Sequence, residues 1–190
     1  MFNEYIFRLA LFSTDYDNYS PISIFKQIFP SQLCSNVNYI KKEKVEFDYN
    51  LDGSNIHTQC NEISDLSKQY NICFCADLFL IFINLEDEIN TLNNLEKILK
   101  YINDTCDFNI KSCFLGILNN NMEIPEKLKV KSLDELIKSI IMNPYEYKEF
   151  NIKEDFENIY RIFSSEIIEN KFINEKNKNN SNSKVYCSIY

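Results

Sequence analysis

The 190-residue sequence has only two glycines, one histidine and no tryptophan. The single imidazole, that of His57, fits an ordinary strand residue in a hairpin, and the cysteines form no C-x-x-C pair. A zinc site therefore lacks ligands at usable spacing, and we expect no metal and reduced, mostly buried thiols. The seven cysteines are Cys34, Cys60, Cys73, Cys75, Cys106, Cys113 and Cys187.

Positive charge is also scarce, because 20 lysines and arginines stand against 28 acidic residues and the formal net charge is −8. No stretch gathers enough basic side chains on one face to bind a nucleic-acid duplex. We therefore expect protein partners and no direct nucleic-acid binding. Hydrophobic residues make up 45% of the chain, which is enough for one globular domain with a sizeable core.

The sequence shows neither a secretory signal nor a membrane span. Glu4 and Arg8 interrupt the apolar segment near the N-terminus. The longest apolar run, residues 72–85, is too short to cross a bilayer and contains Asp77. We expect a cytoplasmic or nuclear location.

Apolar periodicity in the first third of the chain predicts a strand, a helix and a hairpin. Residues 5–12 form a buried strand, and Ser20-Pro21 begins a helix, because Ser favours the N-cap and Pro the first turn. Residues 45–51 alternate apolar and polar side chains, as in a half-buried strand. Asp52-Gly53 then turns the chain into a second strand at 56–60.

Further strands and helices alternate along the rest of the sequence. The run "CFCADLFLIFINL" at 73–85 is typical of a central parallel strand, with Cys73 and Cys75 on one core face. Ser132 and Glu135 form a capping box at the start of a later helix. The remaining predicted elements are a helix over 92–102, a strand from 111, a helix over 133–141, a strand over 145–150 and a helix over 152–167.

This alternation predicts an α/β fold with a single doubly wound, mostly parallel sheet and helices on both faces. Residues 1–170 would form the domain. Residues 171–190 are rich in Asn and Lys with few groups to bury, so we expect a flexible tail there.

The loop between the first strand and the first helix lacks the residues that hold a phosphate. In the pattern G-x-x-x-x-G-K-[ST], glycines let backbone N–H groups converge, the Lys neutralises phosphate and the Ser or Thr binds magnesium. Ser13 and Asn18 replace the two glycines, and Tyr19 replaces the lysine. Only Ser20 agrees with the pattern.

Two acidic residues make the same loop still less suited to a nucleotide. Asp15 and Asp17 would each meet a phosphate, and one such contact at about 4 Å and an effective dielectric of about 20 costs roughly 4 kcal/mol. A nucleoside triphosphate should therefore be rejected. Two questions stay open. Ser20 could be a helix cap or a metal ligand. Asp15 and Asp17 could form a solvated loop, or they could hold magnesium in an unrelated enzyme.

In the order of its elements the chain resembles the small GTPase family over residues 4–168. The segment "EYIFRLALF" is similar to the first strand of that family, "ADLFLIFINLEDEINTLNNLEKIL" to its fourth strand and third helix, and "IKEDFENIYRIF" to its last helix. The D-x-x-G, N-K-x-D and S-A-K motifs are missing at 62–65, 116–121 and 145–147. The resemblance implies a P-loop NTPase-type topology without nucleotide binding, cofactor or catalytic residues, that is, a pseudo-GTPase.

Among pseudo-GTPases the chain is most similar to the centromere protein M family of the inner kinetochore, through "DLFLIFINL", "LNNLEKILKYIND", "FNIKSCFL" and "YKEFNIKEDF". This resemblance implies a nuclear structural subunit needed for chromosome segregation. It also implies a helical-repeat partner, centromere protein I, together with centromere proteins H and K. We expect Phe108 and Ile110 either at the partner contact or in the core.

The last four residues support an alternative. Cys187-Ser188-Ile189-Tyr190 fits C-a-a-X, and a prenylated Cys187 beside the lysines of the tail would form a two-signal anchor. The protein would then be a degenerate Ras- or Rab-like GTPase on the cytoplasmic face of a membrane, acting in signalling or vesicle trafficking.

Overall fold

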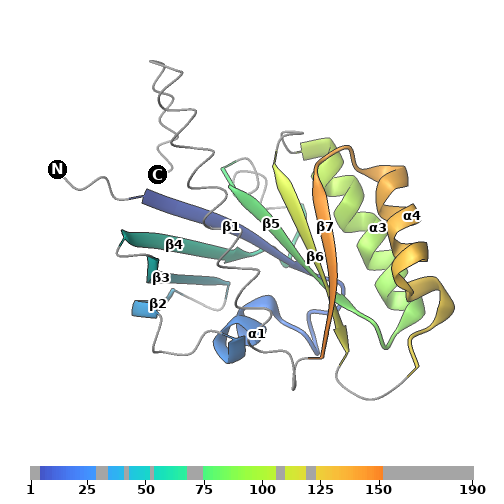
Figure 1. Cartoon of the computed structure of the whole chain (residues 1–190), viewed down its shortest axis with the longest axis horizontal. Coiled ribbons are helices and arrows are strands. Elements are labelled where there is room, and N and C mark those ends of the chain that lie inside the picture. The colour runs from blue at the N-terminus through green and yellow to red at the C-terminus, as the bar shows by residue number, and fades with distance from the viewer. Residues whose placement is uncertain are drawn as a thin grey trace.

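Seven strands form one sheet in the order β2-β3-β4-β1-β5-β6-β7 (Figure 1). The computed structural model describes residues 5–28, 34–40, 43–51, 54–67, 75–105, 110–118 and 123–151. The strands are β1 (Tyr5–Ser13), β2 (Cys34–Ile40), β3 (Lys44–Leu51), β4 (Ser54–Glu62), β5 (Leu78–Asn84), β6 (Lys111–Leu118) and β7 (Tyr145–Asn151). The helices are α1 (Pro21–Ile28), α3 (Glu88–Thr105) and α4 (Val130–Ile140), and a 3₁₀ turn, η1, spans Glu126–Leu128.

The sheet is mixed. Strands β4, β1, β5, β6 and β7 run parallel to one another, whereas β3 is antiparallel to β4 and β2 is antiparallel to β3. The predicted α/β class is therefore confirmed, with a larger antiparallel part than the single hairpin we expected. The hairpin itself is confirmed, because β3 and β4 pair antiparallel with Leu51 opposite Ser54.

Helices cover both faces of the sheet, as predicted. On one face, Leu9 and Leu11 of β1 share a buried cluster with Ile22 of α1. On the other face, Phe12 of β1 belongs to a cluster that includes Leu95 of α3. Helices α3 and α4 lie together on that second face, beside the strands β5, β6 and β7 (Figure 1).

Two local predictions were wrong. Strand β5 begins at Leu78, so Cys75 lies in a turn before it, half-buried, and not on a strand face. Helix α4 begins at Val130, after η1, with Lys129 at its N-cap and no side-chain cap. The expected capping box therefore does not form, and the Ser132 hydroxyl donates instead to the carbonyl of Glu126 at 3.1 Å.

The glycine in the middle of β6 allows the edge strand β7 to pack closely. A β-carbon on Gly116 would lie 2.6 Å from the phenol oxygen of Tyr147 and 2.9 Å from Cδ1 of Leu85. Any larger residue would force these side chains apart. Gly116 is also the first residue of the segment 116–121 that was matched to the guanine-binding motif, so this segment begins inside β6.

Several predictions fall on residues outside the described ranges. These are the last helix at 152–167, the tail at 171–190, the thiols Cys73 and Cys106, Phe108 and the lipidation candidate Cys187.

Candidate functional site at the carboxyl ends of β1 and β5

The neighbouring parallel strands β1 and β5 end where a ligand would be expected in an open α/β sheet. After β1 the chain moves toward β2, β3 and β4, and after β5 it moves toward β6 and β7. Ligands of such sheets bind in the crevice outside the strand ends at the point where the direction reverses. Residues 14–20 follow β1 here, and residues 85–87 follow β5.

Buried hydrogen bonds join these two loops. The backbone N–H of Asn84 donates to Oγ1 of Thr14 at 2.9 Å, and the Thr91 hydroxyl donates to the Asn84 carbonyl at 2.6 Å. The Asn94 side-chain amide donates to the Thr14 carbonyl at 2.9 Å. Thr14, Asn84 and Thr91 are all buried. The bonds therefore hold the start of α3 against the loop that follows β1.

The carboxylate of Asp15 organises the loop after β1. It accepts hydrogen bonds from the backbone N–H of Asn18 at 3.1 Å, from the Asn18 amide at 2.9 Å and from the Asn84 amide at 2.9 Å. Partial burial opposes its ionisation, but these hydrogen bonds outweigh that effect and lower the pKa of Asp15. The Asp15 backbone N–H in turn donates to Oγ of Ser13 at 3.0 Å.

The two acids of the loop do not act as a pair. Asp17 is exposed, whereas Asp15 uses its carboxylate within the loop. Within the described ranges, no group of three or more His, Cys, Asp or Glu side chains is placed to hold a metal ion. Asp17 is therefore solvent-exposed, and Asp15 has a role inside the loop that neither alternative included.

A buried carboxylate occupies the N-terminal end of α1. Oε2 of Glu62 accepts a hydrogen bond from the backbone N–H of Ile22 at 3.1 Å and from the hydroxyl of Ser20 at 2.9 Å. Glu62 is only 7% exposed. The first turn of a helix attracts anions, because its N–H groups lack internal partners and its dipole is positive there. Glu62 therefore supplies, from within the chain, the negative charge that a phosphate would bring to this helix.

Ser20 is the helix cap that the sequence predicted. Its Oγ accepts a hydrogen bond from the backbone N–H of Ser23 at 3.5 Å while the hydroxyl donates to Glu62. Pro21 follows at the first helical position. The sequence did not point to Glu62, because it lies at the end of β4, 40 residues from Ile22.

Tyrosines fill the rest of the loop. Tyr19, at the position of the phosphate-binding lysine, is 7% exposed within the α1-side cluster, and its hydroxyl donates to Oε2 of Glu86 at 3.3 Å. The hydroxyl of Tyr16 donates to the carbonyl of Ile63. The ring of Tyr19 therefore packs in the core where a phosphate loop would present an ammonium group.

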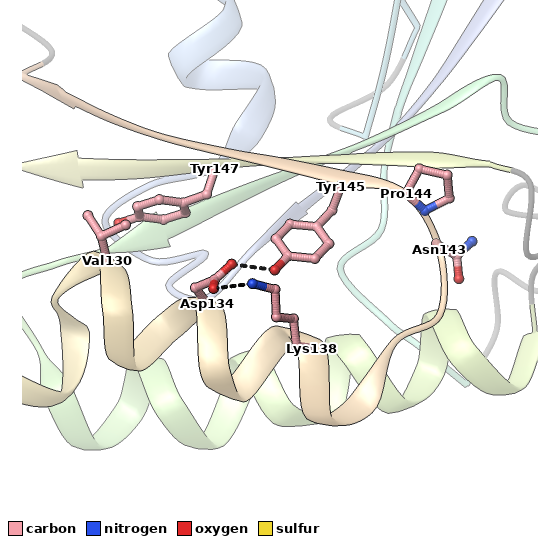
Figure 2. Close-up of a pocket in the computed structure, with 7 residues that line it drawn as sticks. All are labelled: Val130, Asp134, Lys138, Asn143, Pro144, Tyr145 and Tyr147. Atoms are coloured by element: carbon pink, nitrogen blue, oxygen red, sulfur yellow. Dashed lines mark hydrogen bonds and ion pairs between the residues drawn. The ribbon is translucent and has the colours of Figure 1, made fainter.

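A groove lies elsewhere on the molecule, between α4 and β7 (Figure 2). It is open to solvent and has a volume of about 520 Å³. Asp134 accepts hydrogen bonds from Lys138, at 2.6 Å, and from the hydroxyl of Tyr145. These bonds hold the pKa of Asp134 below its ordinary value. The groove is lined by Val130, Asp134, Lys138, Asn143, Pro144, Tyr145 and Tyr147.

The other predicted residues have structural surroundings. Ile110 is half-buried and packs against the α3 and α4 cluster, and its carbonyl accepts a hydrogen bond from the Asn143 amide at 3.0 Å. His57 is an ordinary strand residue on β4, with Nδ1 2.9 Å from Oδ1 of Asp48 on β3. Cys60 and Cys113 are buried, as predicted for thiols. None of the helices in the described ranges has the length and apolar character needed to cross a membrane.

Comparison with known proteins adds no family: no model of a protein family matches the chain, and no curated protein sequence matches it.

Proposed function

We propose that this protein is a non-catalytic α/β subunit of a protein assembly, in which the sheet and its helices serve as a rigid surface. The observation that carries the proposal is the carboxylate of Glu62 at the N-terminus of α1, bonded to Ile22 and Ser20. An anionic ligand would have to displace this carboxylate and break both hydrogen bonds.

Charge repulsion supports the same conclusion. A phosphate placed at the start of α1 would meet Glu62 and would lie on the loop that carries Asp15 and Asp17, with Tyr19 in place of a cation. One like-charge contact at about 4 Å costs roughly 4 kcal/mol at an effective dielectric of about 20, which is nearly three decades of affinity.

The internal hydrogen bonds also favour a fixed surface over a nucleotide switch. A switch needs loops that rearrange when a ligand binds or leaves. Here the loop after β1 is joined to β5 and α3 through the buried residues Thr14, Asn84 and Thr91. Each of these bonds would resist a change in the loop.

The particular assembly is proposed from the sequence resemblance. The segments "DLFLIFINL" and "FNIKSCFL", which supply β5 and β6, are similar to the centromere protein M family. We infer a pseudo-GTPase of the inner kinetochore, held by a helical-repeat subunit like centromere protein I together with centromere proteins H and K. Its role would be structural and would serve chromosome segregation.

The nucleotide part of the proposal is tested with purified protein. Thermal unfolding and titration calorimetry with GTP or GDP and Mg²⁺ should show no stabilisation and no binding heat. A nucleotide that bound the native state would raise its stability. Glu62→Gln tests the contribution of the negative charge to the exclusion of nucleotides, because it removes the charge and keeps an oxygen acceptor. Micromolar GTP binding by the wild-type protein would overturn the proposal.

The assembly part is tested by affinity purification from dividing cells, with identification of the bound proteins. Recovery of a helical-repeat centromere subunit and a punctate nuclear signal would support it. Membrane association that is lost in Cys187→Ser would instead support the lipid-anchored alternative.

A further inference from the structure

The edge strand β2 presents an exposed backbone edge with two exposed apolar side chains. It is the outermost strand on one side of the sheet and pairs only with β3 among the described strands. Residues 35–39 are all exposed. Val37 is 43% exposed and Tyr39 is 49% exposed, two of the six large hydrophobic residues that the described structure leaves exposed. An edge of this kind favours pairing with another strand.

Charge distinguishes β2 from the edge strand on the other side. β7 carries Glu146, Lys148 and Glu149, and charged side chains are a common protection against pairing at a sheet edge. The sequence of β2, "CSNVNYI", contains no charged residue and no proline. In a chain with a net charge of −8, an uncharged strand is where two copies can approach without strong repulsion.

We propose that β2 pairs with β2 of a second copy of this chain, antiparallel and about a two-fold axis at Asn38. In this register Val37 faces the second copy's Tyr39, and the same pair occurs again on the other side of the axis. Pairs of an aromatic and a β-branched residue across antiparallel strands are stabilising. The strand is thus complementary to itself, which is what a two-fold dimer requires.

A bulge limits the length of this contact. The register of β2 against β3 shifts between Ser35 and Asn38, where Asn36 has a left-handed φ of 53°. The Asn36 amide donates to Oδ2 of Asp48 at 2.6 Å and holds this conformation. Because the axis at Asn38 pairs residue 37 with residue 39, the bulge confines the contact to the few residues around Asn38, and we expect a weak, concentration-dependent dimer because the contact is small. The dimer proposal is independent of the proposal that the protein binds no nucleotide.

Analytical ultracentrifugation of the full chain over a concentration series tests the dimer. Val37→Lys and Tyr39→Lys each introduce a lysine on both strands of the contact, so two positive charges come close together. Each substitution should weaken the dimer at least about tenfold. Val130→Lys is the matched control, because Val130 is 49% exposed on α4, and it should leave the dimer unchanged. Circular dichroism of each variant checks that it folds.

Cross-linking tests the register. Oxidised Asn38→Cys should form a disulfide between residue 38 of two copies, identified by mass spectrometry, because side chains on the two-fold axis face each other closely. Asn90→Cys, exposed on α3, should not form the equivalent bond. A protein that stays monomeric up to about 0.5 mM, where even millimolar binding would be visible, would overturn the proposal. Equal dimerisation of wild type and both lysine variants, or equal cross-linking at positions 38 and 90, would overturn it too.

Discussion

The amide nitrogen of Asn84 lies 2.9 Å from Oδ2 of Asp15, so the last residue of β5 is bonded to the loop that follows β1. These residues are 69 positions apart in the sequence. The Oδ1 atom of Asn84 also accepts the backbone N–H of Glu86 at 2.8 Å. A single side chain therefore fixes both loops at the place where an open α/β sheet would receive a ligand.

Replacement of Asp15 by Asn should make the free energy of unfolding less dependent on pH in the acidic range. The folded-state pKa of Asp15 is lowered, so its ionised form contributes stability above the unfolded pKa of about 3.9. That contribution is lost as the pH falls through the folded pKa. In urea unfolding, the advantage of wild type over Asp15→Asn should shrink below about pH 4.

The exposed neighbour Asp17 provides the control for this experiment. Asp17→Asn makes the same replacement on the exposed part of the loop, two residues from Asp15. A constant difference between wild type and Asp15→Asn from pH 7 to about pH 2, well below the unfolded pKa, would contradict the role assigned to this carboxylate.

Replacement of Glu62 by Ala should destabilise the fold by about 1–3 kcal/mol, because the buried N–H of Ile22 would lose its acceptor. Glu62→Gln keeps a side-chain oxygen and should cost less, on the order of 1 kcal/mol. Chemical denaturation at pH 7 measures both. Equal stability of wild type and Glu62→Ala would show that the carboxylate is not what satisfies the start of α1.

The strands that the sequence predicted well are those with the strongest burial pattern. All seven residues of β5 are buried, and the paired strands β3 and β4 alternate apolar and polar residues. Strand β2 was missed because its exposed residues follow no such pattern. Burial leaves a periodic signal in the sequence, whereas an edge strand is defined by the neighbour it pairs with.

The site shows the same limit. The sequence indicated that the loop at 13–20 lacks phosphate-binding residues and that Ser20 caps a helix, since both depend on neighbours in the chain. It did not indicate Glu62 or Asn84, whose partners lie 40 and 69 residues away. Long-range hydrogen bonds depend on strand order and register, which single residues do not specify.

Replacement of Asp77 by Asn should make the protein relatively more stable as the pH rises. Burial raises the pKa of Asp77, although the backbone N–H of Arg8, 2.8 Å from Oδ2, and the positive charge of Arg8 act in the opposite direction. An acid with a raised folded pKa contributes most below the unfolded pKa of about 3.9, and this contribution is lost as the pH rises through the folded pKa.

The measurement is urea unfolding of wild type and Asp77→Asn between about pH 3 and pH 7, a range that begins below the unfolded pKa. The free energy of unfolding of the variant, relative to wild type, should rise over the lower part of this range and then level off. The amide oxygen of Asn can still accept the Arg8 N–H. A relative stability that falls with rising pH would show that the ionised carboxylate is favoured in the fold.

Replacement of Gly116 by Ala should destabilise the protein by about 1–3 kcal/mol, because a β-carbon there would lie 2.6 Å from the Tyr147 hydroxyl and 2.9 Å from Leu85. Tyr147→Phe removes the nearer atom and should recover part of this loss when combined with Gly116→Ala. Part of the cost should remain, since Cζ of Tyr147 would still be 3.3 Å away and Leu85 is unchanged. Chemical denaturation of the two single variants and the double variant gives the coupling energy, and additive effects would show that the Tyr147 hydroxyl and the β-carbon at position 116 do not interact.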